Sequence, residues 1–159
     1  MEKPIFVIDG SRFNDLESFY DEVEHCLIPE VEWGRNLDHF NDILRGNVGL
    51  LPRAYILIWK NMSKSRLDLG YEETIKFWEE VKDRWMKRVR ILEEQVQHSE
   101  SKSLKDKKFI EGMIESSKSS LIKWTEDFEA AQRHEGPTIF DWIMEMIFDE
   151  RKQIEFHPE

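Results

Sequence analysis

Short apolar runs alternate with segments of helical periodicity in the first part of the chain. The run Pro4–Ile8 is followed at once by turn residues, which predicts a buried strand that ends in a turn. Asn14 and Glu17 then have the spacing of a capping box, and apolar residues recur every three or four positions after them. This pattern predicts a first helix from Asn14 to about Cys26.

A second helix and a second strand follow. Asn36 is a good N-cap residue, and the helical pattern after it stops near Gly46. The run Ala54–Trp59 is continuously apolar and rich in residues that favour strands, so we expect a strand covered on both faces. Strands that alternate with helices favour a parallel sheet.

The pattern changes to long helices from Glu72 onward. Apolar residues at spacings of three and four continue to the polar stretch His98–Ser103 and resume up to Ala131, which predicts an antiparallel helical hairpin. Thr138 then begins a last helix through Asp149, and Gln153–His157 is short enough for an edge strand. We therefore expect one α/β domain over residues 1–159, with a helical insertion at about 71–135.

Composition limits the partners of the chain. A net charge of −10 and a pI of about 5.1 disfavour nucleic acid or an anionic membrane as the main partner and fit a basic protein better. A single cysteine, no secretory signal and no apolar run long enough for a membrane span lead us to expect a cytoplasmic protein. The scattered histidines lack metal-ligand spacing, and we expect neither a metal nor a cofactor.

The predicted second helix has two different faces. Projection at about 100° per residue places its apolar residues on one side and Asp38 and Asp42 on the other, one helical turn apart. Asp38 lies in the first turn, where the helix dipole alone favours a carboxylate. Asp42 lies in the middle of the helix and repels Asp38, so packing and propensity do not account for it.

The order of these features resembles the barstar family. The resemblance covers roughly residues 4–60 and rests on the first strand with Asp9-Gly10, the first helix, the segment Trp33-Gly34-Arg35-Asn36-Leu37-Asp38, and Asp42 and Leu44 after it. It implies a small three-stranded parallel sheet flanked by helices. It also implies an intracellular inhibitor that is not an enzyme, that is a monomer when free, and that binds a basic ribonuclease or toxin domain.

The resemblance also implies which residues contact that partner. Asp42 would enter the phosphate subsite, with the rest of the surface made by Trp33, Gly34, Asn36, Asp38, Asn41, Arg45 and Gly46. A further acidic contact would come from the helix before the last strand, and either Glu80 or one of Glu145 and Asp149 could supply it. Glu32 and Asn47 replace aromatic residues of the family pattern, which leaves the target open.

Two other interpretations remain. The chain could keep the fold and bind a partner that is not a ribonuclease, for example through the hairpin. It could also be an enzyme in which Asp38, His39 and Asp42 form a catalytic cluster, although His39 projects away from both carboxylates and no activated nucleophile lies nearby in the sequence.

Overall fold

The computed structural model describes residues 2–49, 51–98, 103–150 and 153–159 and divides into two compact units. Unit 1 comprises residues 1–73 and 137–159, and unit 2 comprises residues 74–136. The elements of unit 1 are β1 (Ile5–Asp9), the short 3₁₀ helix η1 (Gly10–Arg12), α1 (Leu16–Leu27), α2 (Leu37–Leu44), β2 (Tyr55–Lys60), α3 (Met62–Asp68), α6 (Ile139–Asp149) and β3 (Ile154–Pro158). Unit 2 contains the helix α5 (Leu104–Gln132) and the helix α4 (Tyr71–Gln97), except for the first three residues of α4, which belong to unit 1.

Unit 1 is built on a three-stranded parallel sheet with the strand order β1-β2-β3. Val7 is paired with Ile58, and Ile58 with His157, so β2 is the central strand and β3 an edge strand. The α/β class, the parallel sheet and the final edge strand expected from the sequence are thereby confirmed.

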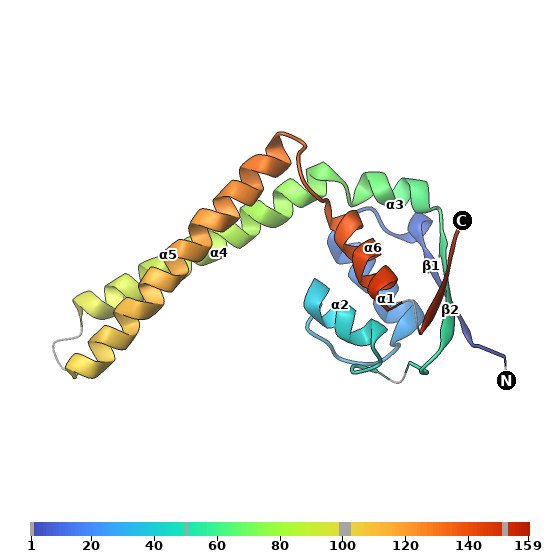
Figure 1. The fold of residues 1–159 in the computed structure, drawn as a ribbon, viewed down its shortest axis with the longest axis horizontal. Helices are drawn as coiled ribbons and strands as arrows, with labels where there is room; N and C mark the ends of the chain where they lie inside the picture. Colours follow the sequence, from blue (N-terminus) through green and yellow to red (C-terminus); the bar gives the residue numbers. More distant parts are fainter. Residues whose placement is uncertain (1, 50, 99–102, 151–152) are drawn as a thin grey trace. The chain divides into compact units, whose positions relative to one another are not determined.

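The helices α1, α2 and α6 all lie on one side of this sheet (Figure 1). On β2, the side chains of Tyr55, Leu57 and Trp59 are buried, whereas Ile56 and Ile58 on the opposite face are only half-buried. The expectation that this strand is covered on both faces was therefore wrong. Because the strands follow each other in sequence order, right-handed crossovers place each connection on the same face of the sheet.

The core of unit 1 is centred on Trp59. The ring of Phe19 from α1 stacks on Trp59 at 5.8 Å and meets Phe40 from α2 edge-on at 5.4 Å. Phe140 from α6 meets Trp59 edge-on at 5.9 Å. The indole N–H of Trp59 donates to the hydroxyl of Ser65 at 2.9 Å, which satisfies its buried polar atom. One aromatic cluster thus joins the sheet to all three covering helices.

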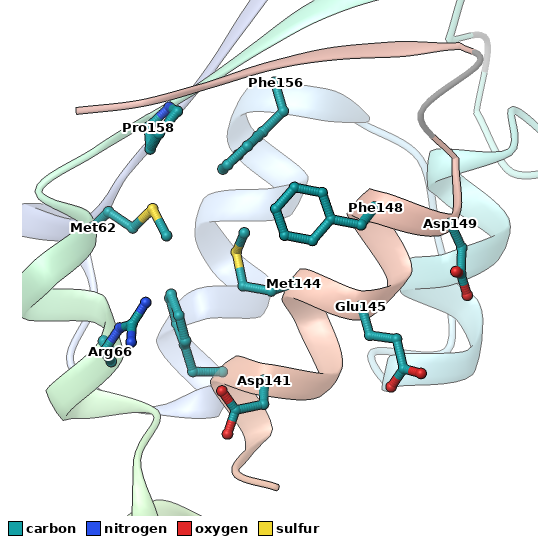
Figure 2. Close-up of a pocket in the computed structure, with 10 residues that line it drawn as sticks. Met62, Arg66, Asp141, Met144, Glu145, Phe148, Asp149, Phe156 and Pro158 are labelled. Atoms are coloured by element: carbon teal, nitrogen blue, oxygen red, sulfur yellow. The ribbon is translucent and has the colours of Figure 1, made fainter.

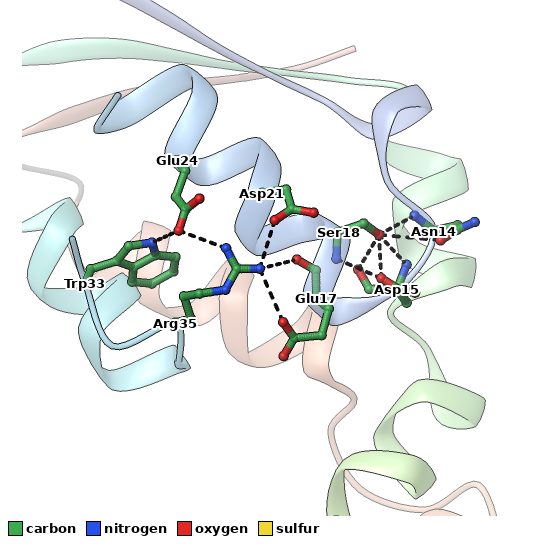
Figure 3. A network of polar contacts seen from close by, with 8 residues as sticks. All are labelled: Asn14, Asp15, Glu17, Ser18, Asp21, Glu24, Trp33 and Arg35. Atoms are coloured by element: carbon green, nitrogen blue, oxygen red, sulfur yellow. Dashed lines mark hydrogen bonds and ion pairs between the residues drawn. The ribbon is translucent and has the colours of Figure 1, made fainter. Parts of the chain in front are cut away.

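The start of α1 differs from its prediction. Its N-cap is Asp15, whose carboxylate accepts the N–H of Ser18, and the Ser18 hydroxyl accepts the N–H of Asp15 in return (Figure 3). The capping box is therefore Asp15 with Ser18, and not Asn14 with Glu17. Asp15 and Ser18 have the same three-residue spacing, and their shorter side chains can make the same reciprocal bonds.

Unit 2 is a pair of long antiparallel helices, α4 and α5 (Figure 1). Trp78 of α4 stacks on Trp124 of α5 with ring centroids 5.2 Å apart, and Lys118 forms an ion pair with Glu93 at 2.6 Å. The polar stretch predicted at His98–Ser103 coincides with the interruption between the two helices, although residues 99–102 lie outside the described residues. The hairpin therefore has its own apolar interior.

Candidate binding surface

The short helix α2 is anchored firmly to the core of unit 1. Phe40, Ile43 and Leu44 are fully buried, as the helical projection predicts. The hydroxyl of Tyr55 on β2 donates to the backbone carbonyl of Leu44 at 3.2 Å, which satisfies one of the free carbonyls at the end of the helix. Asn36 is the N-cap, as predicted, and its side chain accepts the N–H of His39 at 2.9 Å.

The opposite side of α2 carries the predicted carboxylates. Asp38 is exposed and Asp42 is half-buried. Within the described residues, neither side chain takes part in a hydrogen bond or an ion pair. A carboxylate without a hydrogen bond or an ion pair can bind a new cation without first breaking an existing bond.

The loop before α2 is fixed by a network centred on Arg35 (Figure 3). Its guanidinium donates to Glu24 at 2.8 Å, to Asp21 at 2.9 Å and to Glu17 at 3.2 Å, all on α1. These three carboxylates raise the pKa of Arg35. The backbone of Arg35 has a φ of +45°, a left-handed conformation that is uncommon for a residue with a side chain and that the network can stabilise.

Trp33 joins the same network. Its indole N–H donates to Glu24 at 2.7 Å, and its ring meets the buried ring of Tyr20 edge-on at 5.3 Å. The side chain is half-buried, so only part of its surface is open to a partner. Trp33 thus fixes the loop to α1.

Gly34 and His39 attach the loop directly to α2. The N–H of Gly34 donates to Nδ1 of His39 at 2.8 Å. A Cβ atom at Gly34 would lie 2.1 Å from that nitrogen, so the contact requires glycine. His39 therefore holds the loop against α2.

Arg45 and Asn41, which the family resemblance places on the contact surface, have different surroundings. Arg45 donates to Glu150, at the C-terminal end of α6, at 2.7 Å, and this bond raises the pKa of Arg45, with smaller contributions from Asp42 and Asp149. The side-chain oxygen of Asn41 is buried and has no hydrogen-bond partner among the described residues. Gly46 has a φ of +76°, the left-handed conformation that ends a helix and favours glycine.

The helix α6 adds a second row of carboxylates beside α2. It leads into β3 and packs against α2, and Glu145 and Asp149 on it are exposed. Figure 2 shows both carboxylates on the side of α6 that faces away from Phe156. We call Asp38, Asp42, Glu145 and Asp149 the acidic face. Glu80 is exposed on α4 in unit 2, so it is not part of the unit that carries this face.

An apolar groove of about 690 Å³ also borders α6 (Figure 2). Met62 of α3, Met144 and Phe148 of α6, and Phe156 of β3 supply most of its apolar lining. Phe148 and Phe156 meet edge-on at 5.9 Å. Glu145 and Asp149 also border this groove, so the acidic face continues directly into an apolar surface.

The Arg35 network was not predicted from the sequence, although the sequence contains a signal for it. Glu17, Asp21 and Glu24 are spaced by four and three residues, which places three like charges on one face of α1. Such a row is unfavourable unless a cation lies against it. The next arginine after α1 is Arg35, and the structure places it there.

The structure constrains the chemistry of His39, which was considered for catalysis, and of the single cysteine, Cys26. His39 Nδ1 is occupied by Gly34, and burial raises the pKa of the Cys26 thiol to about 12, so it is protonated at neutral pH. Within the described ranges, no three His, Cys, Asp or Glu side chains converge as metal ligands. None of the helices in those ranges has an apolar stretch long enough to cross a membrane.

The fold and the surface together define a small α/β module that presents a fixed acidic helix. Comparison with known families assigns it: the family described as Barstar (barnase inhibitor) matches residues 3–99, and the chain belongs to this family. No curated protein and no solved structure matches the chain. The matched range ends before α5, α6 and β3, so the sheet is completed by a strand from outside it.

Proposed function

We propose that the chain inhibits a ribonuclease by inserting its acidic face into the basic cleft that holds the RNA phosphates. The observation that carries this proposal is the contrast between two sets of carboxylates. Glu17, Asp21 and Glu24 are bound by Arg35, whereas Asp38 and Asp42 form no ion pair among the described residues, and Asp42 has only a weaker electrostatic interaction with Arg45. The carboxylates of α2 are therefore available to bind cations of a partner.

The distribution of charge supports a basic partner. Unit 2 contains 13 Lys and Arg and 13 Asp and Glu, so the net charge of −10 lies entirely on unit 1, which has 10 basic and 20 acidic residues. A charge of this size on a small unit steers a cationic protein toward it and increases the association rate. The hairpin contributes no net charge to this attraction.

The rigidity of the surface supports tight binding. Binding of two proteins is weaker when loops and side chains must become ordered at the interface, because this ordering costs conformational entropy. Here the loop is already fixed to α1 through Arg35 and Trp33, and to α2 through Gly34. A surface ordered in this way before binding retains more of its contact energy as affinity.

The additional acidic contact that the family resemblance implies is assigned in this proposal to α6. Glu145 and Asp149 project from the helix that packs beside α2 and leads into the last strand. Glu80 belongs to unit 2. Asp149 also lies close enough to Arg45 to raise its pKa, which links it to the C-terminal end of α2.

A second candidate function is binding of a protein that is not a ribonuclease. The observation that favours it is that the indole N–H of Trp33 donates to Glu24 on α1 and is therefore not available to a partner. Glu32 and Asn47 are exposed and polar on the two sides of α2 where the family pattern has aromatic residues. The aromatic part of the contact surface is therefore reduced, which changes the range of partners it fits.

The experiment mixes the purified full-length chain with barnase and with a panel of other small basic ribonucleases. RNA cleavage and complex formation by light scattering are measured in parallel, because a catalytically inactive nuclease still forms the complex. We expect inhibition of at least one enzyme with a one-to-one complex. No inhibition and no complex with any member would contradict the proposal, and a complex without inhibition would favour the second candidate.

A further inference from the structure

A groove of about 810 Å³ lies between α4 and α5 in unit 2. Its apolar lining includes Trp85 and Ile91 of α4 and Phe109 and Met113 of α5. A neighbouring hollow shares Trp85, Phe109 and Met113 with it, so the two form one continuous depression, which we call the hairpin groove. The barstar family match ends before α5, which supplies one wall of this groove.

The charged residues that line the hairpin groove are all cationic: Arg84, Lys87, Arg88 and Lys108. All four are exposed, and none forms an ion pair within the described residues. Lys87 and Arg88 follow Arg84 by three and four positions, so both lie beside it on the helix surface and are repelled by it. The hairpin as a whole has no net charge, which makes this cluster a local excess.

Apolar side chains are exposed in the middle of these cations. Phe109 is 70% exposed and Ile91 is 54% exposed, although Trp78 and Trp124 of the same hairpin stack between its helices. Exposed apolar groups that are contiguous and bordered by charge mark a binding surface more often than scattered single residues do. Neither the helical pairing of α4 with α5 nor the acidic face requires them.

We propose that the hairpin groove binds an amphipathic helical segment of another protein, with acidic residues along both edges of its apolar side. An amphipathic helix would place its apolar residues on Ile91, Phe109 and Met113 and its carboxylates against Arg84, Arg88 and Lys108. Charge complementarity and the apolar floor together select this occupant. A nucleic acid would use the cations and could stack on Trp85 and Phe109, but the aliphatic part of the floor, Ile91, Leu92 and Met113, offers its bases neither stacking nor hydrogen bonds.

The probe is a fluorescein-labelled synthetic helix with leucines every three or four positions and glutamates elsewhere. Arg84 to Gln95 spans about 16 Å of α4, so a probe of about 14 residues covers the hairpin groove. Fluorescence anisotropy measures its binding to the full-length chain. We expect saturable binding that weakens as salt is added, and much weaker binding of the same peptide with lysines in place of the glutamates.

Two variants test the two components of the hairpin groove separately. We expect Arg88→Glu to weaken binding of the acidic probe about five- to tenfold, because it replaces an attraction by a repulsion. We expect Phe109→Ser to weaken it more than about tenfold, as for an aromatic anchor. Lys123→Glu is the matched control, since Lys123 is an exposed cation of α5 that does not line the groove. Circular dichroism verifies that each variant is folded.

Several results would overturn the proposal. No binding of the acidic probe, or equal binding of the lysine peptide, would mean that the charge pattern does not select a ligand. An oligonucleotide that binds more tightly than the probe and loses affinity in Arg88→Glu would assign the hairpin groove to nucleic acid. Self-association of the chain that Arg88→Glu abolishes would identify a second copy as the occupant.

Discussion

Arg35 and Trp33 share one oxygen of Glu24: the guanidinium donates to Oε1 at 2.8 Å and the indole N–H donates to the same atom at 2.7 Å (Figure 3). One carboxylate of α1 therefore determines the position of two residues of the loop before α2. The acidic face begins directly after this loop, so its geometry depends on a residue outside the surface itself.

The first prediction concerns this shared oxygen. Glu24→Ala removes the partner of Trp33 and one of three carboxylates around Arg35, so we expect a loss of about 1 kcal/mol in the free energy of unfolding. We also expect faster dissociation from the partner, because the loop must become ordered on binding. Stopped-flow or surface plasmon resonance measures the rates. Glu30→Ala, in an exposed residue of the same loop region, is the control, and equal dissociation rates for the two variants would refute the role of Glu24.

The second prediction concerns the contact between the loop and α2. Gly34→Ala places a Cβ 2.1 Å from Nδ1 of His39, so the exposed imidazole ring must turn away and its hydrogen bond is lost, and we expect a cost of about 1 kcal/mol in stability. His39→Ala removes the clashing ring, so the double variant should lose less than the sum of the two single losses. Chemical denaturation gives the three values. Strictly additive losses would show that Gly34 and His39 do not interact in this way.

The third prediction concerns acid stability. The N–H and hydroxyl of Ser11 and the amide of Asn61 donate to Asp9, and they lower the pKa of Asp9 below its usual value of 3.8. A carboxylate whose pKa is lower in the folded state stabilises the fold above its unfolded pKa, and this contribution is lost as the pH falls through the folded pKa. Asp9→Asn should therefore make stability fall less steeply below about pH 4. Denaturation midpoints from pH 7 downward measure this, and identical slopes for the variant and the wild type would contradict it.

The fourth prediction separates the two units. Phe140 N–H donates to the carbonyl of Leu69 at 3.0 Å, so the chain re-enters unit 1 beside the place where it leaves. Replacing residues 75–135 by a flexible linker should leave unit 1 folded and its affinity for the ribonuclease nearly unchanged.

Two point variants locate the additional acidic contact. Asp149→Ala in the full chain should weaken the complex with the ribonuclease, whereas Glu80→Ala should not. If the deletion or Glu80→Ala abolished inhibition, the additional acidic contact would belong to the hairpin.

The parts of the fold that sequence predicted well are those with a local signal. The apolar side of α2 follows from spacing alone, and Phe40 and Ile43 are buried as expected. Thr138 caps α6 through a capping box with Asp141, and this motif depends only on two residues that are three positions apart in the sequence. In such cases, residues close in the sequence make the contact that defines the element.

The parts that were missed depend on distant residues or lack a pattern. The helix α3 has no side-chain cap at Asn61, and its Leu67 is 80% exposed, so neither a cap nor an apolar stripe indicates it. The role of Arg35 depends on its packing against α1, which no local pattern specifies. The uncovered face of the sheet follows from strand order, which becomes known only with the structure.

The most direct test of the central claim is the affinity of Asp42→Ala for whichever basic ribonuclease the wild-type chain inhibits. We expect a loss of roughly 2–5 kcal/mol in binding free energy, the range for removing one partner of a buried charge pair, with an unchanged melting temperature. Glu126 is an exposed carboxylate of α5, and the control variant Glu126→Ala should bind like the wild type. An affinity of Asp42→Ala equal to that of the wild type would contradict the account.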